Sequence, residues 1–375
     1  MGSLNGYVEA FDSRLGRLNT VAPKVSVIIT NYNYADYVGE ALESVARQNY
    51  PSIECIIVDD SSSDDSLAKI SRFIDNHSSS VSFRLVRHST TRGQYAAFRT
   101  GMEQANGAFV TFLDADDLLL GDFVREHVRV HLTLPPVAFT SSNQYQIDSI
   151  GQMIGGVHPD LLTQNSYRMI ATIALQRPFW VWATTSSMMF RRAVLGFVFA
   201  DADETFRKCA DNYVAHFSNL LGGSILMPTL LGCYRRHQRN NFSNNPLIGG
   251  RLPTGDMRRH PAHEVVLRSI QARLLERRQS FISLLGRPGF LQTLSKVTPW
   301  GDLWRHGRSL SHCEDLGAAD QSNYYVAWAL LHLRRVMRTL KNRHPAFTVV
   351  DLDQTKRGAK VASYADYQRH RRDAK

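Results

Sequence analysis

Cysteines, long apolar runs and glycine-rich phosphate loops are scarce in this sequence, and each shortage argues against a class of protein. The four cysteines among 375 residues lie far apart, at Cys55, Cys209, Cys233 and Cys313. They form no Cys-x-x-Cys pair, which argues against a zinc site or a disulfide framework and is typical of a reducing compartment. No apolar run approaches the ~18 residues of a membrane span, and residues 1–24 lack the apolar core of a signal peptide. We therefore expect a cytoplasmic protein.

The glycine motifs that hold nucleotide phosphates in many proteins are also missing. No Gly-x-Gly-x-x-Gly follows the first predicted strand, and the chain contains no Gly-x-x-x-x-Gly-Lys-Ser/Thr. The first absence argues against a dinucleotide-binding fingerprint, and the second removes the usual ATP or GTP loop. If this chain binds a nucleotide, other groups must hold its phosphates.

The excess of positive over negative charge is confined to the last third of the chain. The net charge is +10, but residues 251–375 hold 23 Lys and Arg against 11 Asp and Glu, or +12, which leaves −2 for residues 1–250. Such an excess is found in proteins that bind nucleic acid, an anionic membrane or an acidic partner. The hydrophobic content of 43% is enough for a sizeable core.

Strand and helix patterns alternate through the first part of the chain. Apolar runs predict buried strands, and helical spacing of apolar residues predicts the helices between them. The predicted strands cover residues 25–30, 53–58, 81–86 and 109–113, and the predicted helices cover 37–48, 67–74 and 92–104. This order predicts an α/β fold with a Rossmann-like, mostly parallel central sheet flanked by helices.

Three of these predicted strands end in polar residues that can bind a ligand. They end at Thr30-Asn31-Tyr32-Asn33, at Asp59-Asp60 and at Asp114-Ala115-Asp116-Asp117. In an open α/β sheet, ligands bind at the carboxyl ends of the strands. Clustered carboxylates repel each other, so they need a cation or must hold protons. Mg²⁺ and Mn²⁺ prefer such oxygen ligands and often bridge to phosphates, although a lone Asp-x-Asp is more often a solvated turn.

Taken together and in order, these segments resemble the nucleotide-sugar-binding half of inverting family 2 glycosyltransferases, which have the GT-A fold. The resemblance extends from Val25 to Ser243 and is carried by several motifs. They are Val25–Asn33, Ala41–Val45, Gln48–Pro51, Val58–Asp64, Leu113–Asp117 and Leu230–His237. The chain departs from the family at Ser61, where glycine is usual, at Thr91 and Arg99, where asparagine is usual, and at Ala210, where a first acidic residue is usual.

The resemblance implies a donor site and a metal site. The residues expected to contact the nucleotide sugar, most simply a UDP-sugar, are Thr30, Asn31, Asn33, Tyr37, Asp59, Asp60, Arg92, Gly93, Asp114, Ala115 and Asp116. Asp59 would recognise the base. Mn²⁺ or Mg²⁺ would be held by Asp114, Asp116 and His237, although His237 could equally be a surface histidine in a basic loop.

The resemblance also implies a catalytic base and an acceptor side. Asp211 occupies the retained acidic position of the helix that supplies the base in this family, with helix capping as the alternative role. Trp180, Trp182 and Asp117 are expected near the acceptor, because aromatic faces suit sugar rings; core packing is the alternative for the tryptophans. The helix over 118–134 and the strand over 137–147 would lie in this half.

The expected organisation has four parts. Residues 1–24 form a leader, and residues 25–243 form a catalytic domain. This domain has a donor half, 25–117, and an acceptor half, 118–243. A linker, 244–258, and a helical, basic C-terminal region, 259–375, follow. Helical periodicity extends over 262–285 and 324–340. In the second of these helices, an apolar stripe could pack on the domain or contact an anionic membrane at its inner face. The stripe consists of Val326, Leu330, Leu333, Met337 and Leu340.

The sequence thus predicts a metal-dependent inverting glycosyltransferase that acts on a saccharide or lipid-linked acceptor in polysaccharide or glycoconjugate synthesis. A sugar-nucleotide-binding protein without transferase activity and a nucleotidyltransferase are the alternatives. A nucleotidyltransferase would need a Gly-rich, basic phosphate loop after the first strand. No nucleic acid is expected as a partner, because the basic residues are remote from the acidic crevice. The oligomeric state stays open.

Overall fold

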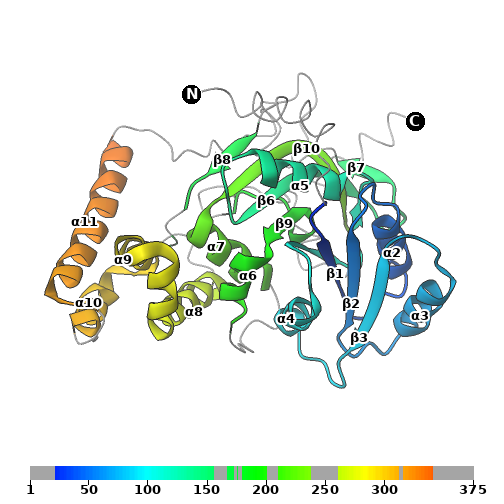
Figure 1. Ribbon diagram of the computed structural model, residues 1–375, viewed down its shortest axis with the longest axis horizontal. Helices are drawn as coiled ribbons and strands as arrows, with labels where there is room; N and C mark the ends of the chain where they lie inside the picture. Colours follow the sequence, from blue (N-terminus) through cyan, green and yellow to red (C-terminus); the bar gives the residue numbers. More distant parts are fainter. Residues whose placement is uncertain are drawn as a thin grey trace.

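The structure is a computed structural model, and it describes residues 22–155, 167–172, 175, 180–200, 210–237, 261–311 and 316–340. Within them, one ten-stranded sheet runs through the molecule in the order β3-β2-β1-β4-β9-β6-β10-β5, with β7 beside β6 and β8 beside β10 (Figure 1). The strands are β1 (Val25–Asn31), β2 (Ile53–Asp59), β3 (Ser82–Arg87), β4 (Phe109–Asp114), β5 (Leu118–Leu119), β6 (Phe139–Ile147), β7 (Met153–Gly155), β8 (Arg168–Ile170), β9 (Met188–Arg191) and β10 (Ser224–Arg235).

The first four strands of this order are parallel, as predicted, and the rest of the sheet is mixed. β3, β2, β1 and β4 pair in parallel, whereas β9 is antiparallel to both β4 and β6. β6 and β10 are parallel again. The expectation of a mostly parallel sheet therefore holds for the four strands of the donor half, and the acceptor half is mixed. The α/β fold with helices around the sheet and a helical C-terminal part is confirmed.

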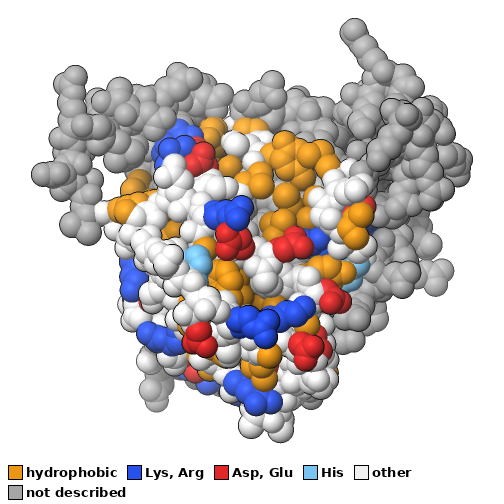
Figure 2. All heavy atoms as spheres, turned by 90° about the vertical axis from the view of Figure 1, so that its right-hand side faces the viewer, with side chains coloured by type: hydrophobic (Ala, Val, Ile, Leu, Met, Phe, Trp, Pro, Cys, Tyr) orange, Lys and Arg blue, Asp and Glu red, His pale blue; other side chains and the backbone are white. Residues whose placement is uncertain are grey.

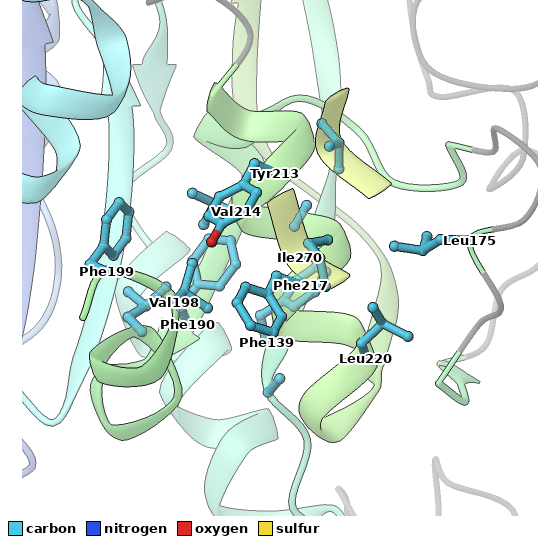
Figure 3. Close-up of a cluster of buried hydrophobic side chains, with 14 of the residues drawn as sticks. Phe139, Leu175, Phe190, Val198, Phe199, Tyr213, Val214, Phe217, Leu220 and Ile270 are labelled. Atoms are coloured by element: carbon cyan, nitrogen blue, oxygen red, sulfur yellow. The ribbon is translucent and has the colours of Figure 1, made fainter. Parts of the chain in front are cut away.

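Helices cover both faces of the sheet because the strand side chains alternate between two apolar layers. On one face, Val27 and Ile29 of β1 share a core with α2 (Val38–Ala46), α3 (Ser66–Asn76) and α5 (Phe123–Thr133). On the other face, Ile28 shares a core with α4 (Gln94–Gln104), α6 (Arg192–Val198) and α7 (Ala210–Gly222). Figure 3 shows part of this second layer, with Phe139, Phe190, Tyr213 and Phe217 directed toward one another.

One predicted helix is wrong at its start. Residues 118–134 were expected to form a single helix, but Leu118–Leu119 is the short strand β5, which pairs with β10. Leu120 also donates its N–H to the carbonyl of Leu231. The helix α5 begins only at Phe123, after Gly121 and Asp122. The leucines are apolar enough for either structure, and pairing with β10 decides between them.

The C-terminal helices continue the core instead of standing apart from it. They are α8 (Pro261–Glu276), α9 (Arg278–Val297), α10 (Leu303–Ser311) and α11 (Ala318–Leu340). Ile270 of α8 and Phe281 and Phe290 of α9 belong to the same apolar layer as α7. The stretch 286–311 was not predicted as helical; Gly286, with φ +71°, kinks α9 just before Pro288. Of the helices in the described part of the chain, none is both long and apolar enough to cross a membrane.

The surface that carries α2 and α3 has both positive and negative side chains, and neither sign dominates it (Figure 2). Figure 2 shows this face, where Lys and Arg side chains alternate with Asp and Glu among apolar patches. This mixed surface agrees with the net charge of −2 for residues 1–250. It offers no basic stripe of the kind that follows a nucleic-acid backbone.

Candidate active site at the ends of β1 and β4

The sheet register brings the predicted strand-end residues into contact. Thr30 lies opposite Asp114 on β4, and Asn31 lies opposite Asp59 on β2. The Thr30 Oγ1 donates to Asp114 Oδ1 at 3.4 Å, and Asn31 Nδ2 donates to Asp59 Oδ2 at 2.7 Å. These contacts follow from parallel pairing, since strands of equal direction present their carboxyl ends at one edge.

The loop after β2 is built around Asp59. Asp59 is fully buried, and its Oδ1 accepts the Ser62 N–H at 2.9 Å. Ser61 has φ +65° and Asn33 has φ +58°, so both adopt the left-handed region. Ser61 stands where the resembling family has glycine, and the positive φ gives the physical reason for that preference. Asp59 thus shapes the loop, and nothing of its side chain is exposed for a base.

Asp60 holds the third loop in place. Its carboxylate accepts the backbone N–H groups of Arg92 at 2.8 Å and Gly93 at 2.7 Å, and it lies 2.7 Å from His88 Nδ1. Gly93, with φ +91°, then precedes the first residue of α4, Gln94. Arg92 and Gly93 therefore contact Asp60, another predicted donor residue, through their backbone N–H groups.

A hollow of about 660 Å³ lies beside the loop after β1. Its lining residues come from this loop and from the start of α3: Tyr32, Asn33, Tyr34, Ala35, Asp36, Asp64, Asp65 and Lys69. The Tyr32 ring is 48% exposed, so it can stack on a base. Tyr32 was not among the predicted donor contacts, although its position directly after a strand end was the available signal.

A cluster of carboxylates occupies the end of β4 and the start of α7. Burial, together with the charges of Asp116 and Asp211, raises the pKa of Asp114 to about 7. Burial also raises the pKa of Asp211, whose carboxylate is hydrogen-bonded by the Thr185 side chain. These directions mean that the cluster resists full ionisation, as expected of acids that face one another without a cation.

Gln94 connects two members of this cluster. Its Oε1 accepts the N–H of Ala210, the first residue of α7, at 3.0 Å, and its side chain also hydrogen-bonds Asp114. Gln94 thereby links the end of β4 to the helix that carries Asp211. Gln94 belongs to no recognised motif, so its role could not be predicted from the sequence.

His237 and Arg235 approach the carboxylates from the end of β10. His237 Nε2 lies 2.9 Å from Asp116 Oδ2, and its ring stacks on Tyr37 at a centroid distance of 4.9 Å. Arg235 is fully buried; its Nε donates to the Asp116 carbonyl at 2.9 Å, and its guanidinium lies 4.9 Å from the centre of the Tyr37 ring. Tyr37, predicted as a donor contact, thus supports these two basic residues.

The expected metal ligands are near one another but are not a ready-made ligand cluster. No group of three or more His, Cys, Asp or Glu side chains is arranged to hold a metal ion within the described ranges. Asp114 and Asp116 nevertheless offer oxygen donors, and His237 offers a ring nitrogen. Burial and the charges of Asp116 and Asp211 raise the pKa of Asp114, and a cation would relieve the repulsion among these carboxylates. The donor set therefore fits Mn²⁺ or Mg²⁺ whose remaining ligands come from a diphosphate.

The three residues expected near the acceptor differ in accessibility. Trp182 is fully buried, and its Nε1 donates to Ser224 Oγ at 2.9 Å, so it has no surface to offer a sugar. Asp117 is also fully buried, and its Oδ1 accepts the Arg235 N–H. Direct contact with an acceptor is not supported for either residue. Trp180, which packs edge-on against Trp182 at 5.3 Å, is partly exposed.

Comparisons with known proteins relate this chain to glycosyltransferases. The model of the glycosyl transferase family 2 matches residues 26–205. A protein of Nostoc sp., named as an uncharacterized glycosyltransferase, is 32% identical over 225 residues, which cover 58% of this chain and 66% of that protein. The Escherichia coli protein WfgD, named as a UDP-Glc:alpha-D-GlcNAc-diphosphoundecaprenol beta-1,3-glucosyltransferase, is 28% identical over 142 residues, covering 38% of this chain and 53% of WfgD.

These matches are partial. The chain spans between a quarter and about two thirds of the length of the first relatives that it matches. Among solved structures, S. aureus TarS in complex with UDP-GlcNAc has 16% sequence identity and a TM-score of 0.49, with coverage of 88% of this chain and 95% of that chain. A similarity at this level carries no argument about the ligand of this chain.

Proposed function

Because residues 26–205 match the model of the glycosyl transferase family 2, we propose that this chain transfers a sugar from a nucleoside diphosphate donor to a hydroxyl group. The donor is a UDP-sugar and the acceptor a saccharide or a lipid-linked sugar in polysaccharide or glycoconjugate synthesis. The observation that carries the proposal is the carboxylate cluster at the end of β4 and the start of α7. It combines acids suited to a cation with a separate acid suited to proton transfer.

The donor end of the site is formed by the loops after β1 and β2. The exposed ring of Tyr32 stacks on the base, while Asp59 and Asp60 keep the surrounding loops in shape. Thr30 and Asn33 border the base and ribose. Their positions are fixed by hydrogen bonds from Thr30 to Asp114 and from the Ser63 N–H to Asn33 Oδ1.

Asp114, Asp116 and His237 would hold the divalent cation. When bound, the cation offsets the negative charge that develops on the departing diphosphate. His237 stays aligned because it stacks on Tyr37, and Asp116 stays aligned because Arg235 donates to its backbone carbonyl. Arg235 is therefore a positioning residue for the cation side of the site.

Asp211 takes the proton of the acceptor hydroxyl. A hydroxyl is a poor nucleophile at neutral pH, and a carboxylate within hydrogen-bond reach accepts its proton as the new C–O bond forms. The bond between the anomeric carbon and the diphosphate oxygen breaks in the same step. Attack from the face opposite the diphosphate inverts the anomeric centre. The raised pKa of Asp211 makes its carboxylate a stronger base than an exposed one.

Calorimetry of UDP binding tests this assignment. The wild-type chain should bind UDP at least about tenfold more tightly with Mn²⁺ than with EDTA, because two carboxylates otherwise repel the diphosphate. Asp116→Ala should abolish the difference, whereas Asp75→Ala, at an exposed position on α3, should keep it. Equal affinity with and without the cation in the wild-type chain would contradict the proposed cation site.

A further inference from the structure

A short 3₁₀ turn, η2 (Thr185–Ser187), lies between the two acidic parts of the candidate site and contacts both. The Ser186 Oγ accepts the backbone N–H of Asp114, at the end of β4, at 3.2 Å. The Thr185 side chain hydrogen-bonds the carboxylate of Asp211, near the start of α7. The turn η2 therefore joins the strand end proposed to hold the cation to the helix proposed to supply the base.

The backbone around this turn is fixed by β6. Gln144 Oε1 on β6 accepts the N–H of Thr184 at 3.1 Å and the Thr184 hydroxyl at 2.8 Å. On the other side of the turn, Ser187 Oγ lies 2.9 Å from Ser141 Oγ of the same strand. Because the residues on both sides of Thr185 are bonded to β6, the Thr185 hydroxyl is held in place before any substrate binds.

The two partners of the Thr185–Asp211 hydrogen bond differ in accessibility. Thr185 is only 3% exposed, so water does not compete for its hydroxyl. Asp211 is partly exposed, so a second ligand can reach its carboxylate. A carboxylate has about four lone-pair sites, and the bonds from Thr185 and from the Asn212 N–H leave others for an acceptor hydroxyl. Burial raises the pKa of Asp211, and the hydrogen bond from Thr185 opposes this rise because it stabilises the ionised form.

A buried threonine does not need such a partner in this fold. Thr111 on β4 is fully buried, and its Oγ1 has no hydrogen-bond partner in the part of the chain that the structure describes. Packing alone therefore does not require the hydroxyl of Thr185 to meet a carboxylate. Thr111 also provides a matched control, because replacing it by valine removes a buried hydroxyl that bonds to nothing.

We infer that Thr185 is a positioning residue whose hydroxyl donates to the Asp211 carboxylate and holds it in one orientation for proton transfer. Thr185 does not contact the substrate and acts only through Asp211. A base held in one orientation meets the acceptor hydroxyl in a reactive geometry more often, which raises kcat and leaves donor affinity unchanged. This inference rests on the proposed function, because it concerns the base of that reaction.

Steady-state kinetics of UDP release at pH 8 test it, with UDP-glucose and UDP-N-acetylglucosamine as donors and octyl glucoside and octyl N-acetylglucosaminide as acceptors. Thr185→Val keeps the shape of the side chain and removes the hydroxyl. It should lower kcat about tenfold and change the donor KM less than about twofold. Thr185→Ser keeps the hydroxyl, so its kcat should stay within about threefold of the wild-type value. Thr111→Val should behave like the wild-type chain.

A double-mutant cycle separates positioning from packing. In the Asp211→Asn background, Thr185→Val should change kcat less than about twofold, because a residue that acts through Asp211 then has no base to position. A packing defect would instead lower kcat in both backgrounds. The melting temperature tests the contact without activity: Thr185→Val should lower it by about 2 °C in the wild-type chain and should not lower it in Asp211→Ala.

Several results would overturn the inference while the proposed function stands. They are a Thr185→Val variant with wild-type kcat, an equal loss of kcat in the Asp211→Asn background, and a Thr185→Ser variant as slow as Thr185→Val. An equal change of melting temperature in the wild-type and Asp211→Ala backgrounds would overturn the contact itself. A wild-type chain that binds UDP with Mn²⁺ but releases none from either donor would overturn the proposed function, and this inference with it.

Discussion

Replacing Asp114 by asparagine should make the protein more stable while removing its cation site. The folded-state pKa of Asp114 is about 7 against an ordinary value of 3.8. A carboxyl whose pKa is raised by folding stabilises the folded state only while it holds its proton. Its ionisation therefore costs stability progressively as the pH rises from about 4 toward 7, and the cost is complete above 7.

The size of this cost follows from the shift. About three pKa units at ~1.36 kcal/mol each give an upper limit of about 4 kcal/mol. Because the site relaxes and takes up water when Asp114 ionises, we expect Asp114→Asn to gain about 2 kcal/mol at pH 8. For a chain of this size that corresponds to a rise in melting temperature of about 4 °C. Asparagine can still accept the hydrogen bond from Thr30.

Thermal unfolding in EDTA measures the effect. The gain of Asp114→Asn should be largest at pH 8 and should shrink at pH 5, where wild-type Asp114 is mostly protonated in the folded state. With Mn²⁺ and UDP present, the wild-type chain should be stabilised and the variant should not. An Asp114→Asn variant that is no more stable than the wild-type chain at pH 8, or whose gain is equal at both pH values, would refute the reasoning.

Three further substitutions probe other parts of the site. Asp211→Asn should leave folding and donor affinity nearly unchanged. It should lower kcat about a hundredfold or more, because asparagine cannot accept the hydroxyl proton. If steady-state kinetics show that the variant keeps most of its kcat, Asp211 caps its helix instead. Gln94→Ala should lower kcat/KM about tenfold, since it removes a hydrogen bond to a charged carboxylate, and unchanged kinetics would show that the link to Ala210 is dispensable. Ser61→Gly should raise the free energy of unfolding by about 0.5–1 kcal/mol in urea titrations, since glycine adopts positive φ without strain; a loss of stability would mean that the serine side chain matters more than φ.

The donor half of the fold could be predicted from the sequence because its signals are local. Each buried strand is a short apolar run that stops at polar residues, and parallel pairing then places Thr30, Asn31, Asp59 and Asp114 at one edge. The departure at Ser61 could also be read, and its φ of +65° explains it. The sequence alone does not show that the carboxylate oxygens of Asp59 and Asp60 accept hydrogen bonds from the backbone of the surrounding loops.

The rest of the site depends on contacts between distant parts of the chain. Gln94 and Ala210 are 116 positions apart, and no motif joins them. Arg235 reads as half of a solvated basic pair, yet it is buried because β10 ends beside Asp116 and Asp117. On its other side Glu40 of α2 accepts from its guanidinium at 2.7 Å. For Trp182 the sequence left an acceptor platform and core packing as alternatives, and the structure shows core packing, with its Nε1 donating to Ser224 Oγ.

The C-terminal region shows the limit of periodicity as a signal. The apolar stripe of α11 was recognised, but spacing alone does not tell which face of a helix is packed. Tyr324 and Trp328 bury the larger aromatic surface and leave the stripe exposed. The helical stretch 286–311 was missed because Gly286, Pro288 and Gly289 suggest a break, whereas the structure absorbs them in a kink of α9.

Proton NMR of nucleotide sugars incubated with this chain and Mg²⁺ tests the central claim most directly. For one donor of a panel, the anomeric signal should disappear as the nucleoside diphosphate appears, and the first sugar product should have the opposite anomeric configuration. Asp211→Asn should consume that donor at least about a hundredfold more slowly. No consumption of any donor while UDP still binds, or a product that keeps the configuration of the donor, would contradict the account.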